Sequence, residues 1–299
     1  MNEYKKFLGR TDLVKNQVER EKLAEQEVAS KKKRSIQQQN KQRWLKYQEQ
    51  LRSELAARYF HSVISAGGES FSNKYSVAFD GVDSAIVGSN SLGITSGISI
   101  SVWVKTTDAS SGFKQIIGEY NWASPASNAN WLLYLSNTGN RIAFLNYNDA
   151  GQRPINIVVP DADANIDDGQ WHHILVTWDN TTNTNSFKIF FDGDIVLQHT
   201  PSLTGIRSVS STPVYIASGQ GSSVYLESNI DEVAVWDSDQ SSNASTIYNE
   251  GIPADLTSLN PLSWWRFEEG SGSTATDSGS GGNDATLTGV TYQEDVPGS

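Results

Sequence analysis

Two polar stretches that combine aromatic rings with amide groups hold the side chains best suited to bind a ligand. The first is residues 119–131, EYNWASPASNANW, and the second is residues 146–153, NYNDAGQR. An aromatic ring can stack on a flat ligand face, and amide groups orient that ligand through hydrogen bonds. We therefore predict a ligand-binding site that contains Tyr120, Asn121, Trp122, Asn128, Asn130, Asn146, Tyr147, Asn148 and Arg153.

The two tryptophans of the first stretch are expected to differ in exposure. Trp122 lies beside Asn121 and three residues before Pro125, in loop-like surroundings, so we expect its ring to be partly exposed. Trp131 begins the apolar run WLLYL, so we expect it to pack in the core. The alternative for the exposed aromatic groups is that they are anchored in the core or against a neighbouring subunit.

Short β-strands are the elements that must position these loops. Residues 169–179, GQWHHILVTWD, carry large side chains on both faces of an extended chain, which is typical of a central strand in a two-sheet sandwich. Further short runs separated by turn residues predict an antiparallel sandwich, with a short helix at 241–250, a strand at 262–267 and an irregular loop at 270–282. The other expected strands are 75–79, 84–88, 98–105, 113–119, 131–135, 141–147, 155–159, 171–178, 186–192, 194–198, 213–217 and 224–237.

Four of these runs carry a family resemblance when they are taken in order. They are GISISVWVK at 97–105, GQWHHILVTWD at 169–179, FKIFFDGDIV at 187–196 and NIDEVAVWD at 229–237. Together they resemble the laminin-G-like or concanavalin-A-like jelly-roll domains, which include the pentraxins. FDG at 79–81 fits the opening strand of that family, and residues 264–287 resemble a glycine-rich segment often found beside such domains. The resemblance implies the fold, but this fold hosts lectins, adhesion modules and hydrolases alike.

The resemblance raises glycoside hydrolysis as one activity. Laminarinase-type members use a strand with Glu-x-Asp-x-x-Glu, and hydrolysis needs two carboxylates at a set separation. The nearest match is Glu227, Asn229 and Asp231, which lacks the third acid, and alternation puts Asp231 and Glu232 on opposite faces. In laminin-G-like domains the matching Asp-Glu pair is usually structural. Because the chain also has no Gly-x-Ser-x-Gly motif and no cysteine, we predict a non-enzymatic protein.

Calcium is the cofactor that the resemblance implies, since members of this fold often bind it through aspartates and carbonyl groups at the rim of the sandwich. Oxygen ligands of this kind suit Ca²⁺. The candidate ligands are Asp80, Asp83 and Asp231. A second acidic cluster lacks the spacing of an EF-hand loop, and turn formation is the alternative explanation for both sets. That second cluster consists of Asp161, Asp163, Asp167 and Asp168.

The first 66 residues differ in character from the rest of the chain. They hold 15 Lys and Arg against 8 Asp and Glu, a net charge of +7. Residues 67–299 hold the remaining 8 and 26, a net charge of −18, and the two sum to the −11 of the whole chain. Residues 10–66 contain no glycine or proline and are rich in helix-favouring types. We predict a basic helical arm with an apolar stripe that needs a partner: Trp44, Tyr47, Leu51, Leu55 and Tyr59.

The run KKKR at 31–34 raises nucleic acid as a partner of this arm. Glutamates lie among the nearby basic residues, and the aromatic groups recur at helical spacing, which favours packing over base stacking. The run is therefore interpreted as a solvated helical face, and nucleic acid is not a predicted partner.

The predicted organisation is a helical arm at 1–66, a linker at 67–73, a laminin-G-like sandwich at 74–252, and a C-terminal strand with a Gly/Ser-rich extension at 253–299. Laminin-G-like domains usually act outside cells, whereas this chain shows no secretory signal, no cysteine and no apolar run that could span a membrane. Assembly of a virus particle inside a host cell reconciles these features. We therefore expect a phage virion protein: a tail or head fibre, spike or decoration protein.

The expected partners follow from this interpretation. The arm would dock on other virion proteins, and the acidic sandwich would face the medium and bind a host-surface glycan or protein. The uncovered stripe of the arm favours a homo-oligomer, for which a trimer is expected. Two alternatives stay open: a carbohydrate-active enzyme or carbohydrate-binding module of the concanavalin-A-like fold, and a bacterial surface adhesion protein.

Overall fold

The computed structural model describes residues 71–108, 112–123, 129–137, 141–160, 164–207, 211–220 and 224–299, together with Lys22 and Lys46. The chain divides into two compact units, Met1–Ser70 and Phe71–Ser299. The predicted helical arm and its stripe lie outside the described residues: Trp44, Tyr47, Leu51, Leu55 and Tyr59.

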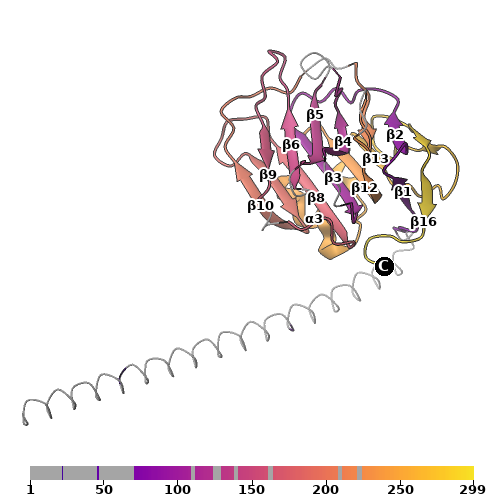
Figure 1. Cartoon of the computed structure of the whole chain (residues 1–299). Coiled ribbons are helices and arrows are strands. Elements are labelled where there is room, and N and C mark those ends of the chain that lie inside the picture. Colours follow the sequence, from indigo (N-terminus) through magenta and orange to yellow (C-terminus); the bar gives the residue numbers. More distant parts are fainter. Residues whose placement is uncertain are drawn as a thin grey trace, which may run out of the picture. The chain divides into compact units, whose positions relative to one another are not determined.

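The second unit is a β-sandwich built from two antiparallel sheets of eight strands each (Figure 1). We call them sheet A and sheet B. In sheet A the strand order is β10 (Asp194–His199), β9 (Phe187–Phe191), β8 (Trp171–Trp178), β3 (Ile98–Lys105), β12 (Glu227–Trp236), β1 (Ser76–Asp80) and β16 (Thr291–Gln293), and β13 (Ser263–Trp265) also pairs with β12. In sheet B the order is β14 (Thr274–Ala275), β15 (Ala285–Thr288), β2 (Ala85–Gly88), β11 (Tyr215–Ile216), β4 (Lys114–Glu119), β5 (Trp131–Leu135), β6 (Ile142–Asn146) and β7 (Asn156–Val158).

Strand β8 lies inside sheet A, between β3 and β9, and it has the bounds that its sequence predicts. Ile174, Val176 and Trp178 point into the main core between the sheets, and Leu175 belongs to a second buried cluster. Side chains of a strand alternate between its two faces, so a strand with two apolar faces needs cover on both. The prediction of a β-sandwich, with neither face of this strand fully wet, is confirmed.

The outer face of sheet A is covered by short helical turns. They are η1 (Ser241–Asn243), α3 (Ala244–Tyr248), η2 (Asn249–Gly251) and η3 (Thr257–Leu259). The helix predicted at 241–250 is thus divided, because Asn249 and Glu250 adopt left-handed conformations with φ of 46° and 59°. No helix among the described residues is long and apolar enough to cross a membrane.

The C-terminal segment completes both sheets. Strand β16 pairs with β1, and β15 pairs with β2, so residues beyond 270 extend sheet A and sheet B together. The indole Nε1 of Trp265 donates a hydrogen bond to the backbone oxygen of Asn283, 2.9 Å away, which ties this segment to the core. The loop predicted at 270–282 is largely irregular but contains the two-residue strand β14.

Candidate functional site

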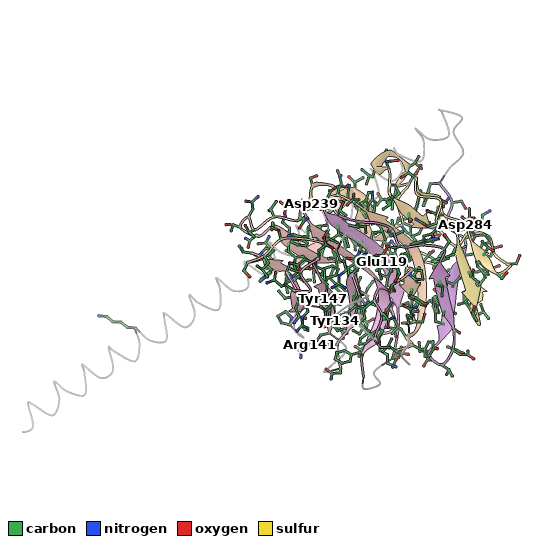
Figure 2. The ribbon with its side chains drawn as sticks, turned by 90° about the horizontal axis from the view of Figure 1, so that it is seen from above. Glu119, Tyr134, Arg141, Tyr147, Asp239 and Asp284 are labelled. Carbon is green, nitrogen blue, oxygen red and sulfur yellow. The ribbon has the colours of Figure 1, made fainter. Side chains whose placement is uncertain are left out.

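The outer face of sheet B carries a cluster of aromatic rings. Strands β5 and β6 bury Leu133 and Phe144 in the main core, so alternation turns Leu132, Tyr134 and Leu145 outward. Rings from neighbouring segments pack on this outward apolar surface; Figure 2 labels Tyr134 of β5 and Tyr147, which follows β6. We call the five rings the aromatic face: Phe113, Tyr120, Trp122, Tyr134 and Tyr147.

The rings of the aromatic face contact one another in a chain. The ring centres of Tyr120 and Trp122 lie 5.0 Å apart, and those of Trp122 and Phe113 lie 5.6 Å apart. Phe113 is 40% exposed and Trp122 is half-buried, whereas the three tyrosines are almost completely buried. Trp131 is fully buried in the main core, as expected. A ligand on this face would therefore contact Phe113 and Trp122.

Two hydrogen bonds fix the position of Trp122. Its Nε1 donates a hydrogen bond to Oε1 of Gln115, 2.9 Å away, and its backbone nitrogen donates one to the oxygen of Gln220, 3.0 Å away. Gly219 permits this close approach, because a Cβ atom there would lie 2.4 Å from the indole ring. The indole is thus held in place before any ligand arrives.

Two arginines approach the ring of Tyr147 from the same region. The guanidinium carbon of Arg207 lies 5.3 Å from the ring centre, and that of Arg153 lies 6.0 Å from it. Arg207 is buried and donates a hydrogen bond to the backbone oxygen of Ala129, whereas Arg153 is exposed. Burial raises the pKa of Tyr134, and the charge of Arg153 opposes that rise. Arg153 is therefore the exposed positive charge of the aromatic face.

Most of the predicted amide ligands hold the loops together. Asn130 and Asn146 are fully buried: the Asn130 amide donates to Oε2 of Glu119 at 2.9 Å, and the Asn146 amide donates to the oxygen of Gly205 at 2.9 Å. Asn148 is also buried, and its Oδ1 accepts a hydrogen bond from the backbone of Gln152 at 2.9 Å. The structure thus places these three side chains behind the site and not on its surface.

The other two predicted amide side chains are those of Asn121 and Asn128. Asn121 is half-buried, and its Oδ1 accepts a hydrogen bond from the backbone nitrogen of Ala123, 3.0 Å away. Asn128 lies outside the described residues.

A buried carboxylate anchors the start of the first predicted loop. Glu119, which Figure 2 labels, is completely inaccessible. It accepts hydrogen bonds from the backbone of Leu92, from Ser91 Oγ at 3.1 Å and from the Asn130 amide. Burial raises the pKa of Glu119, and these donors lower it in part. Neither this anchor nor Phe113 and Arg207 was among the predicted site residues.

The three predicted calcium ligands do not form one group in the part of the chain that the structure describes. Oδ1 of Asp80 accepts hydrogen bonds from the backbone nitrogens of Val82 and Ser84, at 2.9 and 3.1 Å, which lower the pKa of Asp80 and make it a turn residue. Asp231 is fully buried and accepts a hydrogen bond from the Asn73 amide at 2.8 Å. Within the ranges that the structure describes, no group of three or more His, Cys, Asp or Glu side chains could hold a metal ion. Calcium binding through Asp80, Asp83 and Asp231 stays a prediction.

The structure describes only part of the second acidic cluster. Asp161 and Asp163 lie outside the described residues. Asp168 accepts a hydrogen bond from the backbone of Gln170 at 2.8 Å and lies 3.0 Å from Nε2 of His172. These contacts are typical of a turn carboxylate.

The acid pair on β12 lies in the protein interior. Glu232 lies at a bulge with a φ of 47° and accepts hydrogen bonds from Trp264 Nε1 at 2.6 Å and from Arg266 Nε at 3.2 Å. Burial raises the pKa of Glu232 to about 8, and it also raises the pKa of the neighbouring Asp231. Neither carboxylate faces solvent, as expected of a structural pair.

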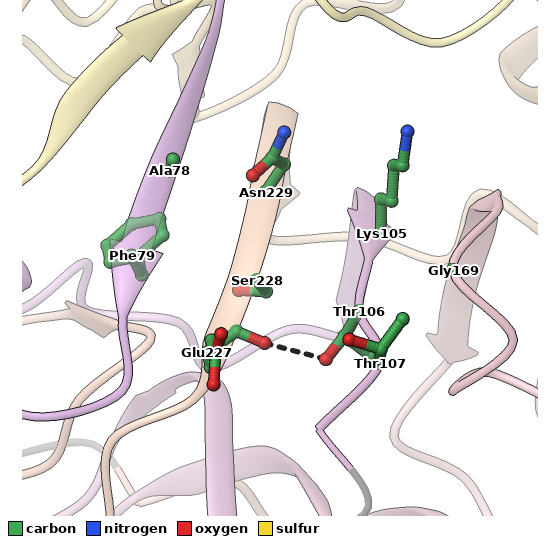
Figure 3. Close-up of a pocket in the computed structure, with 9 residues that line it drawn as sticks. All are labelled: Ala78, Phe79, Lys105, Thr106, Thr107, Gly169, Glu227, Ser228 and Asn229. Atoms are coloured by element: carbon green, nitrogen blue, oxygen red, sulfur yellow. Dashed lines mark hydrogen bonds between the residues drawn. The ribbon is translucent and has the colours of Figure 1, made fainter.

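A small open pocket lies at one end of sheet A (Figure 3). Its volume is about 330 Å³, and its lining includes Lys105, Thr106, Glu227 and Asn229. Thr106 Oγ1 donates a hydrogen bond to the backbone oxygen of Glu227, 2.6 Å away. Glu227 is the one acid among the lining residues, whereas glycoside hydrolysis needs two carboxylates.

The comparisons with known proteins agree with this architecture. A family model described as the concanavalin A-like lectin/glucanases superfamily matches residues 79–244. One similar crystal structure is a candidate carbohydrate-binding protein from Bacteroides ovatus, with a TM-score of 0.58 and 16% identity; the match covers 76% of this chain and 62% of that one. Less than two thirds of that protein's length is therefore represented in this chain.

Two further crystal structures show weaker similarity. A heptameric SAP-like pentraxin from Limulus polyphemus has a TM-score of 0.46 and 10% identity, over 73% of this chain and 96% of that one. A botulinum neurotoxin serotype D binding domain has a TM-score of 0.44 and 15% identity, over 59% of this chain and 42% of that one. No curated protein sequence matches the chain.

Proposed function

The chain belongs to the concanavalin A-like lectin/glucanase superfamily, and on that premise we propose that its sandwich is a non-catalytic module that binds a glycan on the aromatic face. The observation that carries this proposal is the exposed edge of that face. Phe113 and Trp122 lie in contact there and are both accessible. Tyr147, which contacts Tyr120 in the same chain of rings, carries the exposed Arg153. Aromatic rings stack on the apolar faces of sugar rings, and a polar group beside them orients the sugar.

The proposal of a binding module, and not of a hydrolase, rests on the acids of β12. Asp231 and Glu232 are buried and bonded within the protein, and Glu227 stands alone in the pocket of sheet A. General acid catalysis with a nucleophile or base requires two carboxylates at one substrate bond. The similar protein from Bacteroides ovatus, described as a candidate carbohydrate-binding protein, supports the same proposal.

A glycan array with matched variants tests the function. The full chain, the double variant Phe113→Ala/Trp122→Ala and the control Ile252→Ala would be compared on the same array. Ile252 is 53% exposed and follows η2, so its replacement removes a similar exposed apolar group elsewhere. We expect the parent and the control to bind the same glycans and the double variant to lose them. Equal binding by all three proteins would refute the aromatic face as the site.

We further propose that the sandwich is the exposed part of a virion protein and that residues 1–66 dock on the particle. The division of charge supports this, because a segment of net charge +7 precedes a unit of net charge −18. The partners would be other virion proteins at the arm and a host-surface glycan or protein at the sandwich. The assembly would be a homo-oligomer, for which we propose a trimer, formed on a particle assembled in the host cytoplasm.

A further inference from the structure

We propose that the ligand of the aromatic face is an anionic glycan and that Arg153 recognises its negative charge. This inference rests on the proposed function, because it names the chemical class of ligand for the same site. It makes Arg153 the residue that selects acidic over neutral sugars, while Phe113 and Trp122 provide the stacking surface.

The first argument is the pairing of the basic residues in an acidic domain. Residues 67–299 contain only 8 Lys and Arg against 26 Asp and Glu, so carboxylate partners are plentiful. Lys105 pairs with Asp295 at 2.6 Å, and Lys114 pairs with Asp108 at 3.2 Å. Arg153 and Lys74 are exposed and, like Lys188, form no such pair with any described residue. The charge of Arg153 is therefore available to a ligand.

The second argument is where that charge lies. Arg153 is held over the ring of Tyr147, and its charge also acts on Tyr120 and Tyr134. The guanidinium carbon of the buried Arg207 lies 5.3 Å from the centre of the same ring. An anion that approaches this face thus meets the positive charge of Arg153, although residues 67–299 together carry a net charge of −18.

The third argument is the type of side chain. A guanidinium presents several N–H donors in one plane, which match the two oxygens of a carboxylate or sulfate, and it also stacks on aromatic rings. Lysine offers a point charge without that geometry. An arginine on the same face as accessible aromatic rings therefore suits a sugar that carries a carboxylate or a sulfate.

Binding to three polymers tests the inference. The probes are polygalacturonate, which carries carboxylates, heparin, which carries sulfates, and neutral dextran; the proteins are the full-length parent, Arg153→Gln, Arg153→Lys and Trp122→Ala. We expect the parent to bind one of the two polyanions and Arg153→Gln to bind it roughly tenfold more weakly, since a hydrogen bond to a charged group contributes about that much. Arg153→Lys should keep part of the affinity, and a rise from about 50 to about 300 mM NaCl should weaken the parent more than Arg153→Gln.

The basic residues 1–66 are an internal competitor for polyanions, and Arg153→Gln separates the two sites. Polyanion binding that Arg153→Gln leaves unchanged would come from that segment and would overturn the inference, as would a parent that binds neither polyanion. If the parent binds dextran, and Trp122→Ala but not Arg153→Gln loses it, the proposed glycan-binding function holds and the anionic ligand is wrong. If Trp122→Ala also leaves all binding unchanged, the proposed function fails as well.

Discussion

The indole Nε1 of Trp122 donates a hydrogen bond to Oε1 of Gln115, 2.9 Å away. Gln115 is a fully buried residue of β4, so this bond ties a half-buried loop ring to the interior of sheet B. A ring that is already fixed loses little conformational freedom when a ligand binds. This hydrogen bond therefore contributes both to the stability of the sandwich and to the fixed orientation of a ring on the candidate binding surface.

Replacement of Trp122 by alanine should cost stability as well as binding. It leaves Oε1 of Gln115 without its donor, and an unpaired buried acceptor costs about 1–3 kcal/mol of unfolding free energy. Trp131→Ala is the matched comparison: this ring is fully buried in the main core, and its loss should cost on the order of 3–5 kcal/mol. Urea denaturation of both variants measures the difference. A Trp122→Ala variant as unstable as Trp131→Ala would assign that ring to the core.

Gly219→Ala should disturb the site without removing any aromatic group. A Cβ atom at Gly219 would lie 2.4 Å from the Trp122 ring and 2.6 Å from Val224, so the indole must shift. Gly88→Ala is the control, because its Cβ would meet its nearest neighbour, Val214, at an ordinary 3.5 Å. We expect Gly219→Ala alone to change tryptophan fluorescence and to weaken glycan binding. Identical spectra and affinities for the two variants would contradict the close packing of Trp122 on Gly219.

The contribution of Glu232 to the stability of the sandwich should fall as pH rises from about 5 to about 8. Burial raises the pKa of Glu232 from 4.5 to about 8 in the folded protein, so the folded state holds a proton that the unfolded state releases in this range. Asp231 acts in the same direction, because burial and the charge of Glu232 raise its pKa. Glu232→Gln should therefore flatten the pH dependence of the unfolding free energy, measured by urea denaturation at about pH 5, 6.5 and 8. An unchanged slope would show that Glu232 is ionised in the folded state.

Removal of residues 1–66 should leave a folded sandwich that no longer joins its particle. The retained residues include Phe71, whose ring stacks on Trp264 with centres 6.1 Å apart, and Asn73, which donates a hydrogen bond to the buried Asp231. A second truncation that removes residues 1–74 loses both contacts and should melt at a lower temperature. Thermal melts and an assembly assay separate the two effects. A protein without residues 1–66 that still assembles would exclude that segment as the anchor.

Much of the sandwich follows from local sequence patterns. The bounds predicted for β3, β5 and β8 are those of the structure, because each is a run of apolar or β-branched residues between turn residues. Strands β15 and β16 were not predicted. They are short and rich in threonine, and their conformation depends on pairing with β2 and β1, which lie about 200 residues earlier in the chain.

The candidate site was predictable only in part. The surroundings of Trp122 indicate a partly exposed ring, as the structure has it. An asparagine has the same sequence signature whether it binds a ligand or holds a loop. The sequence therefore places Asn130 and Asn146 on the surface, whereas both are fully buried. Arg207 reaches Tyr147 from 60 positions further along the chain, and no local pattern marks that contact. Only the fold brings Arg207 to this ring.

Hydrogen–deuterium exchange of the full chain, with and without the glycan that binds most strongly on the array, tests the central claim most directly. The aromatic face and the pocket of sheet A lie on different segments, so one experiment distinguishes them. We predict slower exchange in peptides that cover residues 112–123 and 146–153 when the glycan is bound. Protection confined to residues 76–80, 105–107 and 227–229 would place the ligand in the pocket and contradict the assignment of the aromatic face.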